Sequence, residues 1–321
     1  MPSMPSGSEN VEQFVTLFDQ AFLAMGVALH RSLQVQAGGG RYRLWIICMD
    51  EEVEHSLRRL NLADVNLIPL REIETDALLA VKPSRSRGEY CWTLTPFAPS
   101  AVFERAPDAQ RVSYLDADLF FFDAPQVLLS ELEQSGKDVL ITEHAYAPEY
   151  DVTEKSGRFC VQFMTFCRTT KGLEVLHSWQ EQCLEWCFAR YEPGRFGDQK
   201  YLDDWPMTFS QSVHIVKQTE KTLAPWNASW FAARGALSPV FFHFQGMRLV
   251  RDRQVLCSTG YRIDATVRSI YYHYLAALSK VLDELEAQGL RVVHIPRPPG
   301  LRQKLRDMRD RLSGTAYWSQ V

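Results

Sequence analysis

The sequence predicts a single α/β domain with a doubly wound sheet, followed by a helical C-terminal extension. Strand and helix signals alternate through the first half of the chain, a pattern typical of a sheet with helices on both faces. The chain has 321 residues, 46% of them hydrophobic and 23% charged, which is enough to bury a full core. No stretch approaches the roughly 18 to 20 uninterrupted apolar residues that a membrane span requires.

The elements of the first half follow from apolar runs and their boundaries. Residues 14–18 form a short apolar run, and Asp19 stands where an N-cap is expected before the amphipathic stretch 21–36. A glycine run ends that helix, and the apolar runs 44–49 and 65–70 predict two more strands separated by a charged helix. In such a sheet, ligands bind at the carboxyl ends of the strands.

The second half adds strands and longer helices. We expect helices over 94–104, 172–189 and 267–288, because apolar residues recur there at helical spacing. Apolar runs predict strands over 111–122, where an acidic break interrupts the run, and over 139–142.

We expect three parts: a disordered lead at 1–12, the main domain at 13–260 and a helical, basic extension at 261–321. The lead has neither the basic start nor the apolar run of a signal peptide. Residues 291–311 carry seven Lys or Arg against two Asp, on a chain whose net charge is −4. This local excess fits a solvated surface helix or, alternatively, a peripheral contact with an anionic membrane at its inner face.

Composition excludes several classes of protein. A nucleic-acid binder usually carries an excess of positive charge, whereas the net charge of this chain is negative. The seven cysteines include no C-x-x-C pair, which argues against a zinc ribbon and fits a reducing cytoplasm. Cys183 and Cys187 lie four apart in a helical pattern, which fits core packing or, alternatively, metal or redox chemistry.

The strongest chemical signal is Asp116-Ala117-Asp118, which stands in a short break between two apolar stretches. Acids two apart on a continuous strand point to opposite faces, so a pair acting on one ion must lie where the strand ends and the chain turns. Carboxylate oxygens suit Mn²⁺ or Mg²⁺, which keep coordination positions open for substrate phosphates.

Six separated motifs resemble those of the GT-A glycosyltransferases, and among these the retaining bacterial enzymes of family 8. The resemblance extends over roughly residues 13–250. The motifs are FVTLFD at 14–19, YCWTLTP at 90–96, YLDAD at 114–118, FGDQKYL at 196–202, APWN at 224–227 and HFQG at 243–246.

The resemblance implies a Rossmann-like GT-A domain with a mixed sheet. It also implies metal-dependent transfer of a hexose from a UDP-sugar to a glycan, lipooligosaccharide or protein acceptor, with retention of configuration. In such enzymes the two acids of the D-x-D motif and a late histidine hold the metal ion and the diphosphate. On this chain the metal ligands would be Asp116, Asp118 and His243.

The implied donor contacts begin at the end of the first strand, where the uridine would lie against Leu17, Phe18, Asp19 and Phe22. Family 8 commonly has a lysine and Pro-Trp after the glycine of the histidine motif, whereas this chain has Met247-Arg248. We expect Arg248 to contact the phosphates instead, because the guanidinium fork suits them. The other expected donor contacts are Arg87, Ala117, Trp226, Asn227 and Gly246. Trp226 fits stacking on a sugar ring or, equally, core packing.

Three residues are expected to act in catalysis. The resemblance places Asp198 and Gln199 beside the anomeric carbon and the acceptor. A helix cap at Gly197-Asp198 is the alternative explanation for this pair. Gln162 falls where the family often has Asn and Gly near the donor sugar.

Other functions explain parts of the pattern. A phosphohydrolase of the haloacid dehalogenase type also places D-x-D after an apolar strand, but near the start of its domain, whereas more than a hundred residues precede the motif here. Such enzymes also have a small residue after the second acid, where this chain has Leu119. A nucleotidyltransferase would need a Gly-rich phosphate loop after the first strand, and 18–22 contains no glycine. A non-catalytic protein that binds nucleotide-sugars is a third alternative, against which the intact Asp116, Asp118 and His243 argue.

Overall fold

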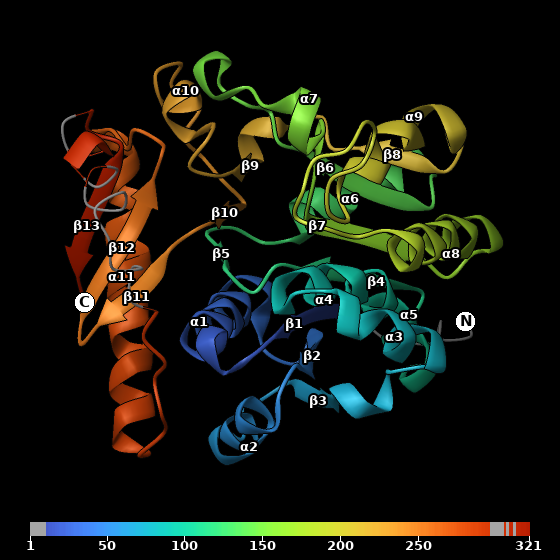
Figure 1. Ribbon diagram of the computed structural model, residues 1–321, viewed down its shortest axis with the longest axis horizontal. Coiled ribbons are helices and arrows are strands. Elements are labelled where there is room, and N and C mark those ends of the chain that lie inside the picture. The colour runs from blue at the N-terminus through green and yellow to red at the C-terminus, as the bar shows by residue number, and fades with distance from the viewer. Residues whose placement is uncertain (1–10, 296–304, 306–307, 311–312) are drawn as a thin grey trace, which may run out of the picture.

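A seven-stranded sheet forms the centre of the computed structural model, which describes residues 11–295, 305, 308–310 and 313–321 (Figure 1). Its strand order is β3-β2-β1-β4-β7-β6-β8. The strands are β1 (Glu12–Phe18), β2 (Tyr42–Cys48), β3 (Val65–Pro69), β4 (Arg111–Leu115), β6 (Val139–Glu143), β7 (Phe159–Cys167) and β8 (Val213–Ile215).

The sheet is mixed. β1 pairs in parallel with β2 and β4, and β2 pairs in parallel with β3, whereas β7 runs antiparallel to both β4 and β6. The carboxyl ends of β1, β4 and β6 therefore lie at the same edge as the start of β7. The predicted doubly wound α/β fold is confirmed, and this edge is where such a sheet binds ligands.

Helices cover both faces of the sheet. One hydrophobic cluster joins the sheet to α1, α2, α6 and α11, and a second joins it to α3, α4, α5 and α8. The helices are α1 (Leu23–Leu33), α2 (Glu51–Leu60), α3 (Asp76–Val81), α4 (Arg87–Leu94), α5 (Phe97–Arg105), α6 (Gln126–Ser135), α7 (Thr153–Ser156), α8 (Thr170–Glu185), α9 (Trp205–Thr208), α10 (Ala228–Ala232) and α11 (Ala265–Ala287).

Local signals explain where most helices begin and end. Asp50 caps α2 by accepting a hydrogen bond from the N–H of Val53 at 2.8 Å, and Ser86 and Glu89 form a capping box at α4. The helix expected over 94–104 is found as α5, but it begins at Phe97, because Pro96 lacks the N–H that a longer helix would need there; α4, just before it, was not expected. α8 ends at Glu185, four residues earlier than expected.

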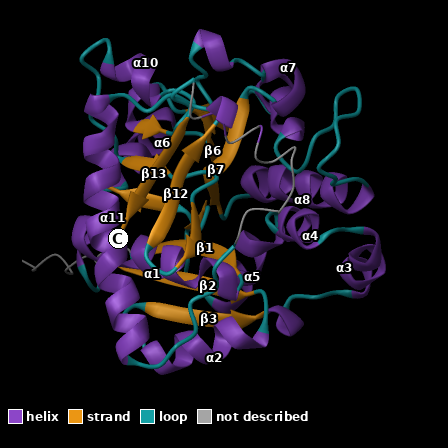
Figure 2. Cartoon of the chain, turned by 60° about the vertical axis from the view of Figure 1, so that its left-hand side comes forward, coloured by secondary structure: helices purple, strands orange, loops and turns teal. Residues whose placement is uncertain are grey.

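Two small sheets complete the chain. β5 (Leu119–Phe121), β10 (Phe241–His243) and β9 (Thr222–Leu223) form one, in the order β5-β10-β9. β11 (Arg248–Arg251), β12 (Gln254–Thr259) and β13 (Ala316–Gln320) form the other, in which β13 runs antiparallel to β12 (Figure 2). The C-terminal part thus contains a strand as well as the helix α11, which packs along α1.

No helix in the described part of the chain is long and apolar enough to cross a membrane. Most of the expected lead, residues 1–10, lies outside the described residues. So do five of the seven basic side chains of 291–311: Arg297, Arg302, Lys304, Arg306 and Arg311. The two that are described form ion pairs, Arg291 with Glu52 and Arg309 with Asp310.

Candidate active site

The D-x-D segment occupies the turn between β4 and β5, at the carboxyl edge of the sheet. The N–H of Leu119 donates to the carbonyl of Asp116 at 3.2 Å and closes this turn. β5 then pairs with β10, in a register that sets His243 opposite Leu119. The N–H of Phe244 donates to the carbonyl of Asp118 at 2.9 Å. The small sheet thereby brings a histidine from 125 residues downstream to the two acids.

Asp116, Asp118 and His243 could hold a metal ion, because one ligand atom from each lies within 4.8 Å of the others. His243 Nε2 is 3.1 Å from Asp118 Oδ1 and 3.6 Å from Asp116 Oδ2. His243 Nδ1 donates to Gln162 Oε1 at 2.9 Å, and this bond aims Nε2 at the carboxylates. Two carboxylates and an imidazole with a fixed orientation suit Mn²⁺ or Mg²⁺.

Charges at this site depend strongly on one another. Burial raises the pKa of Asp116 to about 6; His243 opposes this shift and Asp118 adds to it. Burial disfavours a charged imidazole, but Asp118 and Asp116 outweigh it and hold the pKa of His243 well above its usual value. In the metal-free protein the two carboxylates thus favour the charged form of this imidazole, and a bound dication would take over its role as counter-ion.

A cavity of about 820 Å³ opens beside these residues. Its lining includes fourteen of the sixteen expected site residues: Leu17, Phe18, Asp19, Phe22, Arg87, Asp116, Ala117, Asp118, Asp198, Gln199, Trp226, His243, Gly246 and Arg248. The wall of the cavity is formed in part by the ends of β1 and β4, by the start of α4 and by the turn after β10.

Gln162 and Asn227 do not line the cavity. Both are fully buried, and both orient a neighbour instead. Gln162 holds His243, and its Nε2 donates to the hydroxyl of Thr142 at 3.3 Å. Asn227 donates to the carbonyl of His144 at 2.9 Å and accepts from the N–H of Ala224 at 2.9 Å. Sequence spacing identified the segments but could not show which way these side chains point.

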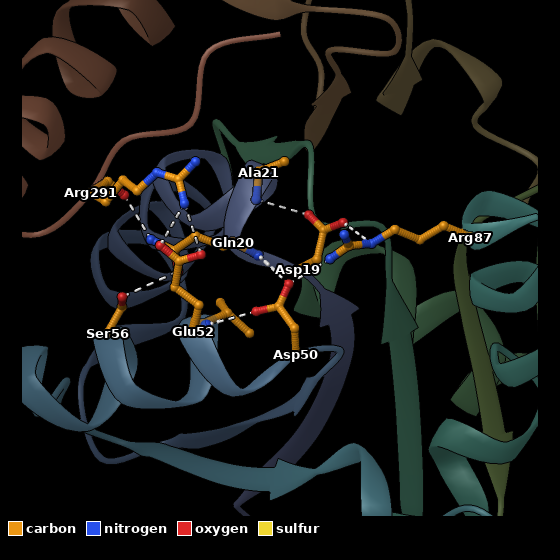
Figure 3. A network of polar contacts seen from close by, with 9 residues as sticks. Asp19, Gln20, Ala21, Asp50, Glu52, Ser56, Arg87 and Arg291 are labelled. Atoms are coloured by element: carbon orange, nitrogen blue, oxygen red, sulfur yellow. Dashed lines mark hydrogen bonds and ion pairs between the residues drawn. The ribbon is translucent and has the colours of Figure 1, made fainter.

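The end of the cavity nearest β1 is held by a polar network (Figure 3). Arg87 Nε lies 2.7 Å from Asp19 Oδ2, and the same guanidinium pairs with Asp50. Asp19 also accepts from the N–H of Ala21 at 2.9 Å, which confirms it as a cap. The two acids hold Arg87 at the cavity wall near the end of β1.

The same network ties the C-terminal part of the chain to this end of the cavity (Figure 3). Gln20 Nε2 donates to the carbonyl of Arg291 at 2.7 Å, and Ser56 donates to Gln20 Oε1 at 3.1 Å. Ile295 then donates its N–H to the carbonyl of Leu249 at 2.8 Å, and Ile295 lines the cavity.

Asp198 lies on the floor of the cavity, only 5% exposed. Burial and the nearby Asp116 raise its pKa to about 8. Gly197 precedes it with φ +57°, and a Cβ there would touch the ring of Trp92 at 3.4 Å. The short helix that follows has Gln199 as its N-cap, with no capping hydrogen bond from that side chain. Gln199 Nε2 instead donates to the carbonyl of Ser156 at 2.6 Å.

Sequence reasoning missed several lining residues. Tyr114 donates its hydroxyl to Asp116 Oδ1 at 3.0 Å, and its position two residues before the acid was the only signal for it. Tyr146, Tyr261 and Ile295 come from segments without a recognisable motif, and only the folded chain brings them to the cavity.

The fold and this site place the chain among proteins with the GT-A glycosyltransferase fold. The structure matches that of the galactosyltransferase LgtC, solved with donor and acceptor sugar analogues, with a TM-score of 0.51 and 14% identity. The match covers 86% of this chain and 99% of LgtC. At this identity the likeness shows the fold, and the GT-A part of the sequence resemblance is confirmed.

The chain belongs to the same family as YfnF of Bacillus subtilis (strain 168), to which it is 32% identical over 258 residues. That alignment covers 75% of this chain and 84% of YfnF. It is also 29% identical over 259 residues to YfnD of the same organism, covering 77% of this chain and 82% of YfnD. Both relatives bear the description "uncharacterized protein". No family model matches the chain.

Proposed function

We propose that the protein is a metal-dependent glycosyltransferase that moves a hexose from a UDP-sugar to an acceptor with retention of configuration. The observation that carries the proposal is the convergence of Asp116, Asp118 and His243 beside a cavity that begins at the end of β1. The GT-A fold supports it, because the site occupies the edge where such a sheet binds ligands.

The leaving group explains why these residues are needed. Breaking the bond between the anomeric carbon and the diphosphate leaves negative charge on the phosphate oxygens. A dication held by Asp116, Asp118 and His243 would neutralise that charge without a proton transfer. Gln162 keeps His243 oriented, and Tyr114 does the same for Asp116.

The other lining residues divide between binding and chemistry. Leu17, Phe18 and Phe22 would pack against the uracil. Arg87 and Arg248 are the basic side chains of the described lining, and both suit the diphosphate. Asp198 and Gln199 would lie beside the anomeric carbon and the acceptor hydroxyl. The raised pKa of Asp198 favours its protonated form in the metal-free protein.

The decisive experiment incubates the protein with a panel of UDP- and GDP-sugars, with and without Mn²⁺, and measures released nucleoside diphosphate. We expect release from one UDP-sugar, and only with metal. Asp118→Ala should abolish that release, whereas the exposed Asp123→Ala, which removes an acid outside the cavity, should not. Metal-independent release, or no release together with no calorimetric binding of UDP, would contradict the proposal.

We also propose that the protein works in the cytoplasm, at the inner face of the membrane. The basic segment 291–311 supports this, because an excess of basic residues attracts a protein to anionic lipid.

A further inference from the structure

Aromatic side chains gather in the part of the cavity farthest from β1. Tyr146 and Tyr261 line this part, and the ring of Trp226 packs against both, at centroid distances of 6.0 and 6.3 Å. Tyr146 also stacks on His144 at 4.6 Å, with ring planes 10° apart. Trp226 reaches the cavity with only a small part of its surface, since it is 4% exposed, and most of its ring packs in the protein, where it supports the two tyrosines.

The sheet separates this aromatic end from the nucleotide end. His144 and Tyr146 follow β6, whereas Leu17 and Asp19 lie at the end of β1. β4 and β7 stand between them, and three strand spacings of about 4.8 Å separate the two ends by about 14 Å. Asp116 follows β4 and so lies between them. A donor that places its base at β1 and its diphosphate at Asp116 therefore points its sugar toward this end, so the acceptor that receives the sugar must bind at the far side of it, beside the tyrosines.

The backbone at this end is held in a strained conformation. Ala145, between His144 and Tyr146, has φ +46°, in the left-handed region that residues with a Cβ rarely adopt. Hydrogen bonds to neighbouring backbone maintain it: the carbonyl of His144 accepts from Trp226 Nε1 at 2.7 Å, and the N–H of Ala147 donates to the carbonyl of Trp226 at 3.0 Å. The fold thus tolerates strain at the residue that sets Tyr146 beside the cavity.

At the aromatic end, none of the described residues that line the cavity carries a formal charge. Burial lowers the pKa of His144 to about 3, so its imidazole is neutral, and Nδ1 lies 3.1 Å from the carbonyl of Gly157. The charged groups in the described lining belong to the β1 end, the metal site and the segments after β10 and before Gln199. Ser156 and Gln199 supply uncharged polar groups near the tyrosines.

We propose that Tyr146 and Tyr261, backed by Trp226, form the acceptor subsite, and that the group bound there is an uncharged pyranose ring of a glycan. This inference rests on the proposed function. A pyranose presents a face of C–H bonds that packs on an aromatic ring, while its edge hydroxyls bond to uncharged polar groups. A phosphorylated lipid would bring a charge for which the described lining of this end offers no counter-ion. A serine or threonine side chain would leave the aromatic surface unused.

The test is saturation-transfer NMR on the protein with UDP and Mn²⁺. The probes are the methyl β-pyranosides of glucose, galactose, mannose and N-acetylglucosamine, with a Ser- and Thr-containing peptide as the competing class. We expect transfer to the ring protons of at least one glycoside and none to the peptide. Tyr146→Ala and Tyr261→Ala should each weaken that binding about tenfold, because each removes one stacking surface.

Matched variants separate loss of stacking from misfolding. Tyr146→Phe and Tyr261→Phe keep the rings and should keep the binding. Tyr272→Ala removes a tyrosine that is 58% exposed on α11, away from the cavity, and should change nothing. Transfer to no glycoside while UDP binds, or equal transfer in wild type and both alanine variants, would overturn the proposal. Calorimetry on the same samples measures whether the wild type binds UDP. If it does not, the proposal that the donor is a UDP-sugar is wrong, which is a different outcome from failure of the acceptor proposal.

Discussion

The side-chain oxygen of Gln162 accepts a hydrogen bond from Nδ1 of His243 at 2.9 Å. This bond joins β7 of the central sheet to β10 of the small sheet that β10 forms with β5 and β9. The bond leaves Nε2 of His243 facing Asp118. Gln162 does not line the cavity, and it therefore acts on the candidate metal site through the orientation of His243.

Replacing Gln162 by Leu should weaken Mn²⁺ binding by about tenfold to a hundredfold, since the imidazole loses the group that orients it. Titration of Mn²⁺ followed by electron paramagnetic resonance measures this affinity directly. Gln162→Glu keeps an acceptor at the same place and should bind Mn²⁺ more tightly than Gln162→Leu. Equal Mn²⁺ affinities for the wild type and Gln162→Leu would show that Gln162 has no role in metal binding.

Asp198 should make the metal-free protein less stable as the pH rises. Its pKa is about 8 in the folded chain and about 3.9 when unfolded, so the folded state holds a proton that the unfolded state has lost between those values. This group alone should lower the free energy of unfolding by up to about 1.4 kcal/mol for each pH unit in that window.

Asp198→Asn cannot ionise and should show a flatter dependence of stability on pH between 4 and 8. Urea unfolding in the presence of a chelator, at several pH values, measures the difference. Asp203→Asn, at a carboxyl outside the cavity, serves as the control and should leave the slope as in the wild type. A wild-type slope in Asp198→Asn would show that Asp198 is ionised at neutral pH.

Arg248 is exposed at the start of β11 and lines the cavity. Arg248→Ala should raise the KM for the donor about tenfold with a smaller change in kcat, because one charged contact to a phosphate is lost in both ground and transition states. Arg248→Lys should recover part of the loss, since an ammonium keeps the charge but not the fork. Arg251→Ala, on the same strand outside the cavity, is the matched control. An unchanged KM in Arg248→Ala would exclude the phosphate contact.

The basic segment should bind anionic vesicles. Replacing Arg302, Lys304 and Arg306 by Gln should reduce co-sedimentation with vesicles rich in phosphatidylserine about tenfold or more, at about 1 kcal/mol for each charge. Replacing Lys171, Lys217 and Lys280, which are exposed elsewhere, removes the same charge and should have little effect. Equal losses for both triple variants would point to net charge rather than to this segment.

The sequence predicted the parts of the fold and site that depend on local patterns. Alternating apolar runs identified β1, β2 and β3, and an acidic break within such a run identified Asp116 and Asp118. Apolar periodicity did not predict α4, whose start depends on the capping box of Ser86 and Glu89, and it placed the start of α5 three residues too early.

What the sequence could not predict depends on contacts between distant segments. The pairing of β13 with β12 and the meeting of Tyr146 with Tyr261 have no local signal. The direction of a side chain near a strand end also escapes pattern analysis, which is why Gln162 and Asn227 were expected in the cavity and lie behind it.

Because Gln20 and Leu249 hold the segment that carries Ile295, the wall of the cavity near β1 draws on both ends of the described chain. A nascent chain of which only the central sheet has left the ribosome therefore still lacks part of this wall. The nascent protein should gain affinity for its nucleotide late in synthesis, after α11 has packed on α1 and β13 has joined β12.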